Sequence, residues 1–226
     1  LYGHAGVAAD RAVIRLMAAT LAAAEVSAAR IDLGHVAVFR ALAAAACVDG
    51  ELEATLLLLL QGKDLPGLAD TCRRLDEPWR SALLVLPELY GDVDILARAR
   101  RELPPLPGIV AALATLQELQ VSLPDLPLSF DLADLRGYHY HNGVVFAAYC
   151  PGYSTAIARG GRYDGVGSVF GRARPATGFS LDLRELARLR ASSPQPGAIL
   201  ARCAAAGSTL AQAIAVLRDD PAVERF

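Results

Sequence analysis

The chain has no excess of basic residues, and this bears on its possible partners. The sequence has 22 Lys and Arg against 24 Asp and Glu, which gives a formal net charge of -2 at pH 7. Lys63 is the only lysine. Proteins that bind a nucleic-acid backbone usually present a clustered basic face. We therefore expect no nucleic-acid partner.

Cysteines are few and widely separated. The four of them, Cys47, Cys72, Cys150 and Cys203, form no C-x-x-C pair. This spacing favours neither a disulfide framework nor a zinc knuckle. It is typical of a protein kept in a reducing cytoplasm, and we expect a cytoplasmic location.

The sequence also lacks an apolar run of membrane-spanning length. The run of leucines, Leu56–Leu60, is far shorter than the roughly 20 residues that a helix needs to cross a bilayer, and charged residues flank it on both sides. We expect no membrane partner. The chain begins at Leu1 with neither Met nor a basic-then-apolar leader, so no targeting signal is visible and we expect N-terminal sequence to be missing.

Apolar periodicity and the spacing of Gly, Pro and Asp predict the order of elements. Helices are expected over Asp10–Val26, Phe39–Cys47, Glu51–Gln61, Leu65–Leu75, Trp79–Leu86, Val93–Glu102, Ile109–Leu119, Asp182–Arg190 and Thr209–Arg218, with Asp10 as a candidate N-cap. Strands are expected from Arg30 to the Gly34–His35 step, through Leu128, Phe130 and Leu132, and over Val144–Tyr149, Ser154–Arg159, Thr177–Leu181 and Ala198–Ala201.

This order predicts an α+β fold in which hairpins give an antiparallel sheet flanked by helices. A helical insertion at about residues 39–120 interrupts the strands. We expect one core domain over residues 1–191, incomplete at its N-terminal side. Residues 197–226 are expected to begin a small C-terminal α/β unit that is truncated, after a linker over Ser192–Pro196.

The densest group of polar residues and glycines lies in two neighbouring segments. The first is Arg136-Gly-Tyr-His-Tyr-His141, and the second is Arg159-Gly-Gly-Arg-Tyr-Asp-Gly165. An Arg guanidinium can bind a carboxylate while adjacent rings wall a small side chain. Alternatively, the glycines only shape hairpins while the tyrosines fill the core, because aromatic residues mostly pack.

His139 and His141 raise the possibility of a metal site. On a strand the two side chains would share a face, with Asp131, Asp134 or Cys150 as further ligands. No third ligand has convincing spacing, so we expect no metal. The sequence also has no G-x-S-x-G and no G-x-x-x-x-G-K-[ST] motif, and we expect no cofactor.

Three blocks in the same order resemble the histidine-binding core of histidyl-tRNA synthetases. They are Phe130-Asp-Leu followed by Arg136-Gly-Tyr-His-Tyr140, then Gly160-Gly-Arg-Tyr-Asp-Gly165, then Pro175-Ala-Thr-Gly-Phe179. The opening Leu1-Tyr-Gly-His-Ala-Gly6 is similar to the exit from the second class II signature motif. The resemblance implies a class II aminoacyl-tRNA synthetase-like core.

Two departures from the synthetase pattern argue against catalysis. The loop that reads Leu-Asp-Tyr-Tyr in the synthetases reads Tyr138-His-Tyr-His141 here. The third signature motif ends in Gly-x-Glu-Arg, whose arginine braces ATP, but the matching positions here are Asp182, Leu183, Arg184 and Glu185. A carboxylate where a triphosphate must lie is repulsive, so adenylation is expected to fail.

With these departures the chain resembles the noncatalytic, synthetase-like regulatory subunits of ATP phosphoribosyltransferase. That resemblance implies no catalytic residue, association with the short-form catalytic subunit, L-histidine as effector, and self-association as a dimer within a hetero-oligomer. It implies a ligand pocket formed by Arg136, Tyr138, His139, Tyr140, His141, Gly160, Gly161, Arg162, Tyr163 and Asp164. A divergent histidyl-tRNA synthetase and a stand-alone amino-acid-binding module remain alternatives.

Overall fold

The structure is a computed structural model that describes residues 1–26, 28, 30–189 and 204–219. The chain folds as two compact units, Leu1–Arg190 and Ala191–Phe226. In the second unit the described element is helix α9, Thr209–Asp219, which confirms the helix expected there. The strand expected over Ala198–Ala201 and the linker over Ser192–Pro196 lie outside the described residues.

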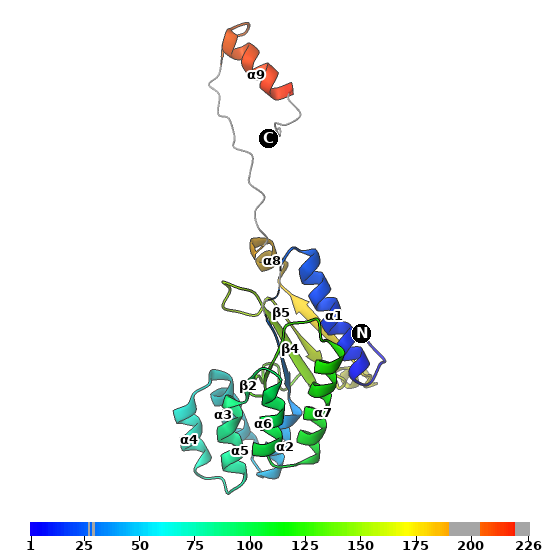
Figure 1. Cartoon of the computed structure of the whole chain (residues 1–226), viewed down its shortest axis with the longest axis vertical. Helices are drawn as coiled ribbons and strands as arrows, with labels where there is room; N and C mark the ends of the chain where they lie inside the picture. The colour runs from blue at the N-terminus through cyan, green and yellow to red at the C-terminus, as the bar shows by residue number, and fades with distance from the viewer. Residues whose placement is uncertain (27, 29, 190–203, 220–226) are drawn as a thin grey trace. The chain divides into compact units, whose positions relative to one another are not determined.

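The first unit is built on one six-stranded sheet (Figure 1). Its strands are β1 (Arg30–His35), β2 (Tyr90–Gly91), β3 (Leu128–Asp131), β4 (Val144–Tyr149), β5 (Ala158–Arg162) and β6 (Thr177–Leu181), in the order β2-β3-β1-β4-β5-β6. Neighbouring strands are antiparallel except β1 and β3, which are parallel. The sheet is therefore mixed, because the long helical crossover between β1 and β3 lets two strands run in the same direction.

Helices surround this sheet and form the insertion. They are α1 (Val7–Ala23), α2 (Ala37–Ala45), α3 (Gly50–Gly62), α4 (Leu65–Cys72), α5 (Trp79–Val85), α6 (Asp94–Glu102), α7 (Pro107–Ser122) and α8 (Leu183–Leu189), with 3-10 turns η1 (Leu86–Glu88) and η2 (Val166–Phe170). Helices α1 and α7 pack against the sheet, whereas α2 to α6 lie together at one end (Figure 1). This confirms the α+β organisation and the helical insertion.

Alternation along the strands gives the sheet two different faces. On β1, Ile31 and Leu33 are fully buried in the main hydrophobic core. The opposite face carries Asp32, which pairs in register with Ala147 of β4. Ala147 pairs in turn with Arg159 of β5, so a row of polar and small side chains crosses this face.

The N-terminal segment continues the sheet at its β6 edge. Gly3 N donates to Pro175 O at 2.7 Å, and Thr177 N donates to Leu1 O at 3.0 Å. Tyr2 forms an antiparallel bridge with Ala176. Residues from the two ends of the unit are therefore held side by side.

Several local expectations are wrong. Helix α1 begins at Val7 with Gly6 as its N-cap, so Asp10 is not a cap but a buried first-turn residue. Strand β5 covers Ala158–Arg162 rather than Ser154–Arg159. The two-residue strand β2 carries too short a pattern to be recognised in the sequence.

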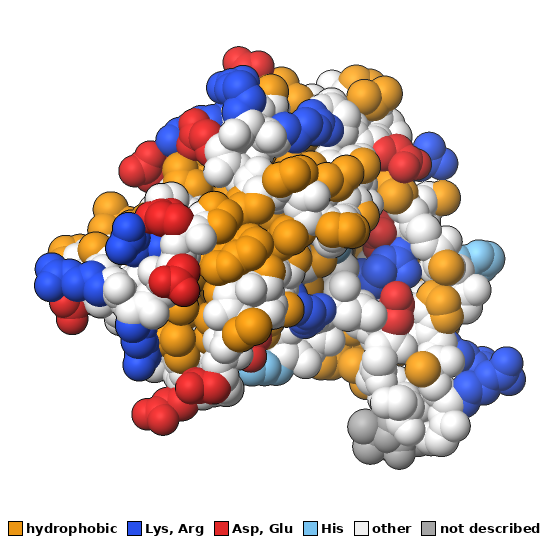
Figure 2. All heavy atoms as spheres, turned by 90° about the horizontal axis from the view of Figure 1, so that it is seen from below, with side chains coloured by type: hydrophobic (Ala, Val, Ile, Leu, Met, Phe, Trp, Pro, Cys, Tyr) orange, Lys and Arg blue, Asp and Glu red, His pale blue; other side chains and the backbone are white. Residues whose placement is uncertain are grey.

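Apolar side chains also reach the surface. Figure 2 shows them gathered at the centre of the face seen from below, with charged side chains around them. Leu58, Leu65 and Val110 are about half exposed or more, at 70%, 48% and 54%. Among the described residues, no helix combines the length and the hydropathy that crossing a membrane requires.

Candidate functional site

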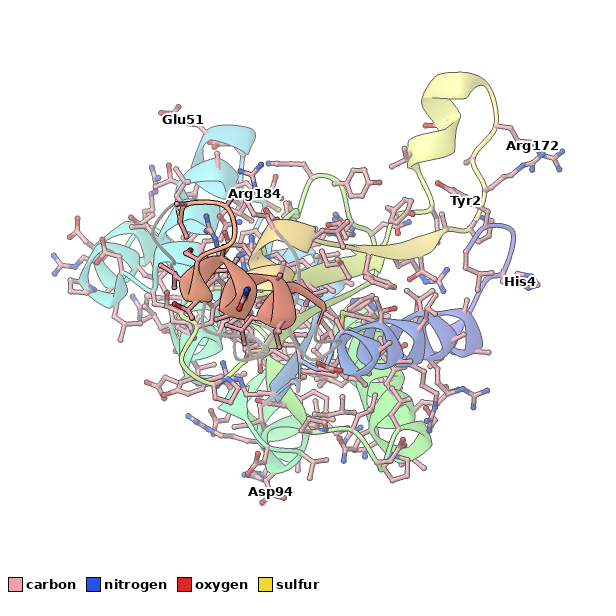
Figure 3. All side chains as sticks on the ribbon, turned by 90° about the horizontal axis from the view of Figure 1, so that it is seen from above. Tyr2, His4, Glu51, Asp94, Arg172 and Arg184 are labelled. Carbon is pink, nitrogen blue, oxygen red and sulfur yellow. The ribbon has the colours of Figure 1, made fainter. Side chains whose placement is uncertain are left out.

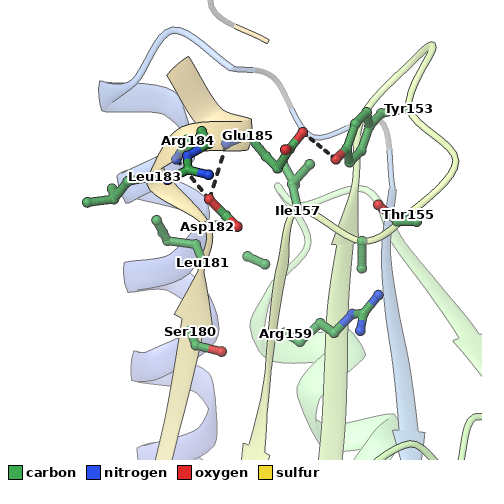
Figure 4. A pocket seen from close by; sticks show the side chains of 12 residues that line it. Tyr153, Thr155, Ile157, Arg159, Ser180, Leu181, Asp182, Leu183, Arg184 and Glu185 are labelled. Carbon is green, nitrogen blue, oxygen red and sulfur yellow. Dashed lines mark hydrogen bonds between the residues drawn. The ribbon is translucent and has the colours of Figure 1, made fainter. Parts of the chain in front are cut away.

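An open cleft of about 910 Å³ lies between β5, β6 and the start of α8 (Figure 4). Its floor comes from the two strands, and its rim comes from α8 and the loop that precedes β5. The lining residues are Tyr153, Thr155, Ala156, Ile157, Ala158, Arg159, Ser180, Leu181, Asp182, Leu183, Arg184 and Glu185. The cleft thus contains the positions matched to the third signature motif.

Both acidic residues of the cleft are held in defined positions. Asp182 Oδ1 accepts hydrogen bonds from the backbone N of Arg184 at 2.8 Å and of Glu185 at 3.2 Å, where it starts α8. Glu185 accepts one from Tyr153 Oη at 2.5 Å and one from Arg188 Nη1 at 2.6 Å. The Glu185 carboxylate is therefore fixed at the rim of the cleft by two donors.

The histidine-bearing segment is a turn rather than a strand. Gly137 has φ +71°, a left-handed conformation that favours glycine. The backbone N of Tyr140 and of His141 both donate to Gly137 O, at 2.9 and 2.8 Å. His139 and His141 consequently do not alternate as strand residues would. No group of three or more His, Cys, Asp or Glu in the described part of the chain could hold a metal ion.

Three of the expected pocket residues come together as a ring cluster. The centroid of the Tyr140 ring is 4.9 Å from that of Tyr163 and 5.1 Å from that of His141. Tyr2 adds an edge contact with Tyr163 at 6.4 Å. Tyr140 is 51% exposed and Tyr2 68%, so the cluster opens to solvent on one side.

His141 is a half-buried member of this cluster. A Cβ on Gly161 would come within 2.8 Å of His141 Nδ1, and one on Gly137 within 2.7 Å of His141 Cδ2. The absence of these two side chains makes room for the imidazole. Burial lowers the pKa of His141, which favours a neutral ring at neutral pH.

Tyr138 and His139 point to different surroundings. Tyr138 is 4% exposed, donates to Glu53 Oε1 at 2.5 Å and packs against Phe39 at 5.4 Å. Burial and the Glu53 carboxylate raise the pKa of Tyr138 to about 12. His139 is exposed and contacts the edge of the Tyr138 ring. The structure therefore places neither side chain in the ring cluster.

Arg136 is already paired within the protein. Its Nε and Nη2 donate to the two carboxylate oxygens of Asp134 at 2.8 and 2.7 Å, and Nη2 also donates to Tyr149 Oη at 2.6 Å. The bonds to Asp134 raise the pKa of Arg136. A ligand carboxylate would have to compete with Asp134 for this guanidinium.

Arg162 and Asp164 fasten the N-terminal segment to the sheet. The Arg162 guanidinium contacts Asp10 at 2.9 Å and Asp164 at 3.1 Å, and it donates to Gly6 O at 2.8 Å. Asp164 Oδ1 also accepts from Ala176 N at 2.8 Å. Burial raises the pKa of Asp10, and the Arg162 charge opposes that rise. The contacts of both residues are thus to protein groups.

Gly160 and Gly161 let chain segments approach each other closely. A Cβ on Gly160 would meet Gly178 O and the Phe146 ring, and one on Gly161 would come within 2.6 Å of Val144 O. The close approach at Gly160 is thus to neighbouring strands. At Gly161 it also involves His141 of the ring cluster.

Sequence reasoning misses several polar members of the cleft, among them Arg159 and Tyr153. It places Arg159 at the end of an expected strand and at the start of the glycine-rich segment, but not among the expected pocket residues. Tyr153 lies in no motif, and its hydrogen bond to Glu185 joins residues 32 apart in the sequence. The signal that could have indicated the cleft is the strand alternation of β5, which puts Arg159 and Arg162 on opposite faces of the sheet.

A second hollow of about 550 Å³ lies on the helical insertion. Its two cations are paired, Lys63 with Asp131 at 3.0 Å and Arg98 with Glu88 at 2.9 Å. Lys63 also lies over the Tyr90 ring, 4.6 Å from its centroid. These contacts leave the first cleft as the stronger candidate for a ligand.

Comparisons with known proteins agree with this geometry. A family model described as histidyl-tRNA synthetase matches residues 1–186. A curated relative from Azoarcus sp. (strain BH72), named ATP phosphoribosyltransferase regulatory subunit, is 58% identical over 201 residues, which are 89% of this chain and 52% of the relative. The chain thus spans about half the length of that relative.

Solved structures give the same fold. An ATP phosphoribosyltransferase regulatory subunit/histidyl-tRNA synthetase from Bacillus halodurans superposes with a TM-score of 0.77 at 28% identity, over 86% of this chain and 53% of that one. A chain of an ATP phosphoribosyl transferase complex from Thermotoga maritima superposes with a TM-score of 0.63 at 16% identity, over 80% of this chain and 63% of that one. At that identity the second likeness concerns the fold alone.

The sheet order and the β6–α8 segment beside the cleft define a class II aminoacyl-tRNA synthetase-like domain. This confirms the class expected from the sequence. Because the family model covers most of the sequence, the chain belongs to the histidyl-tRNA synthetase family.

Proposed function

We propose that this chain is part of a regulatory subunit of ATP phosphoribosyltransferase. In that role it is required by the short catalytic subunit for the first step of L-histidine biosynthesis, and it carries feedback control by histidine. The names of relatives at 58%, 54% and 50% identity support this role. Because the chain spans about half of them, the role of the whole protein is carried over as a proposal.

The observation that carries the noncatalytic part of the proposal is the position of Glu185. The residue stands where the synthetase motif has its ATP-bracing arginine, and its carboxylate is fixed by Tyr153 and Arg188. A fixed negative charge repels a triphosphate rather than stabilising it. Adenylate formation in this cleft is therefore disfavoured, and the chain supplies no catalytic residue and no cofactor of its own.

The effector part of the proposal rests on the ring cluster. Tyr140 and Tyr163 offer flat ring faces beside the half-buried imidazole of His141, which suits an aromatic amino acid such as histidine. Histidine and the catalytic subunit would prefer different conformations of one assembly. Each would then change the affinity of the other by the same factor.

The assembly is proposed to be a cytoplasmic hetero-oligomer in which this subunit self-associates as a dimer. Curated relatives carry the name of a subunit, which supports a partner chain. Cys47 and Cys72 are free thiols, in keeping with a reducing compartment. The balanced charge of the chain gives no support to a nucleic-acid partner.

The test is the ATP phosphoribosyltransferase rate of the short catalytic subunit from the same organism, with and without the full-length protein, each titrated with L-histidine. A rate that rises on mixing and falls with histidine supports the proposal. No change in rate, together with histidine-dependent ATP–pyrophosphate exchange by the full-length protein alone, would indicate a divergent histidyl-tRNA synthetase instead. No change and no exchange would favour a stand-alone binding module.

A matched pair of variants tests the effector site. His141→Ala removes the imidazole from the ring cluster, whereas His139→Ala removes an exposed imidazole two residues away. We expect His141→Ala to weaken inhibition by histidine while activation on mixing is retained, and His139→Ala to leave both intact. Equal inhibition curves for the two variants would contradict this placement of the effector.

A further inference from the structure

In the cleft beside α8, the acidic side chains have hydrogen-bond partners, whereas two of the basic side chains have none in the described part of the chain. The carboxylates of Asp182 and Glu185 are engaged with the start of α8 and with Tyr153 and Arg188. The guanidinium groups of Arg159 and Arg184 have no hydrogen bond or ion pair with any described residue. Within the described ranges, Arg159 and Arg184 therefore have no carboxylate partner, whereas each carboxylate of the cleft is held by other donors.

Arg159 stands on a part of the sheet that leaves room around it. In register, its neighbours are Ala147 on β4 and Ser180 on β6, both with short side chains. Arg159 itself is exposed. Figure 4 shows its side chain in the cleft, between the strand that carries Ser180 and the loop that carries Thr155.

This situation differs from that of the other arginines near the candidate site. Arg136 already binds Asp134 through two nitrogens, and Arg162 binds Asp10 and Asp164. Arg159 can therefore bind an outside anion without first losing a carboxylate partner.

We propose that the cleft between β5, β6 and α8 binds a small ligand through an anionic group, a carboxylate or a phosphate, held by Arg159. A guanidinium offers a planar pair of N–H donors that matches both groups. The Ser180 and Thr155 hydroxyls line the same cleft and can add hydrogen bonds. Ile157, Leu181 and Leu183 supply apolar contact for the body of the ligand.

The inference goes beyond the proposed function, because it needs neither a transferase partner nor an effector in the ring cluster. It also differs from synthetase chemistry. The positive charges stand at Arg159 and Arg184, whereas the motif position that should be arginine is Glu185. A ligand here meets a different arrangement of charge from the one that braces ATP.

The experiment measures binding by calorimetry on the full-length protein, with inorganic phosphate and succinate as separate probes at millimolar concentration. Arg159→Gln removes the proposed anchor. Arg172→Gln is the matched control, because Arg172 is exposed, has no ion pair among the described residues and lies in the β5–β6 loop, well apart from Arg184 in Figure 3.

We expect at least one probe to bind the wild type, and Arg159→Gln to weaken it about tenfold, equal to about 1.4 kcal/mol. Arg172→Gln should leave the affinity unchanged. Binding of phosphate alone identifies a phosphate-bearing ligand, and binding of succinate alone identifies a carboxylate. Circular dichroism checks that each variant is folded.

Two results would overturn the inference. One is that neither probe binds the wild type. The other is that Arg159→Gln and Arg172→Gln weaken binding equally, which would show only the effect of net charge. Neither result would change the outcome of the transferase assay. The binding experiment therefore tests this inference independently of the proposed function.

Discussion

Replacing Gly160 by alanine separates a packing role from a ligand role in the glycine-rich segment. A Cβ at this position would overlap Gly178 O of β6 and lie 2.5 Å from Phe146 Cε2 of β4. One of these groups is backbone and cannot rotate away, so the strands must separate. Overpacking of this kind costs about 2 kcal/mol.

Gly165, five residues along the same motif, provides the control. Nothing lies within 4 Å of a Cβ built there, and its φ of -79° suits any residue. Gly165→Ala should therefore be neutral or slightly stabilising, because it restricts the unfolded chain.

The assay is urea unfolding followed by circular dichroism. With a slope of about 2 kcal/mol per molar urea, a cost of about 2 kcal/mol lowers the Gly160→Ala midpoint by about 1 M. The Gly165→Ala midpoint should not fall. If both variants unfold at the wild-type midpoint, the close approach of β4, β5 and β6 at Gly160 does not constrain the fold as described.

Three further predictions concern stability. Burial lowers the pKa of His35 to about 4. As pH falls from 6.5 towards 4, the unfolded chain therefore binds a proton at His35 that the folded protein does not, and stability falls. Between pH 7 and pH 5 the wild type should lose about 2 kcal/mol more than His35→Asn, which keeps an acceptor for Ala37 N, and equal losses in urea titrations would refute this. Tyr138→Phe should cost about 1–2 kcal/mol by leaving Glu53 without its donor, yet leave histidine inhibition unchanged; altered inhibition would place Tyr138 at the effector. Asp49→Ala, which removes the N-cap of α3, should cost about 1 kcal/mol in the same unfolding assay, and no cost would mean that the cap is dispensable.

The helices and most strands could be predicted because their signals are local. The apolar spacing of α3 and the alternation of β4 are contained in the elements themselves. The exceptions have physical reasons. β2 is two residues long and exists only because it pairs with β3, and the parallel pairing of β1 with β3 depends on segments almost 100 residues apart.

The candidate site is less predictable, because side-chain partners come from distant positions. Arg162 meets Asp10 across 152 residues, and Tyr138 meets Glu53 across 85. The sequence around Tyr138 and Tyr140 does not show that one ring is buried in the core while the other faces solvent. That difference follows from the turn at Gly137, because Tyr138 and Tyr140 do not share one face as they would on a strand.

The cleft beside α8 has a genetic consequence. All of its lining residues fall between Tyr153 and Glu185, so a single short stretch of the gene encodes them. The surface of the helical insertion is encoded elsewhere. Mutation or exchange of that stretch could therefore alter which small molecule the domain recognises while the insertion remains intact, and the two surfaces could diverge independently during evolution or in the laboratory.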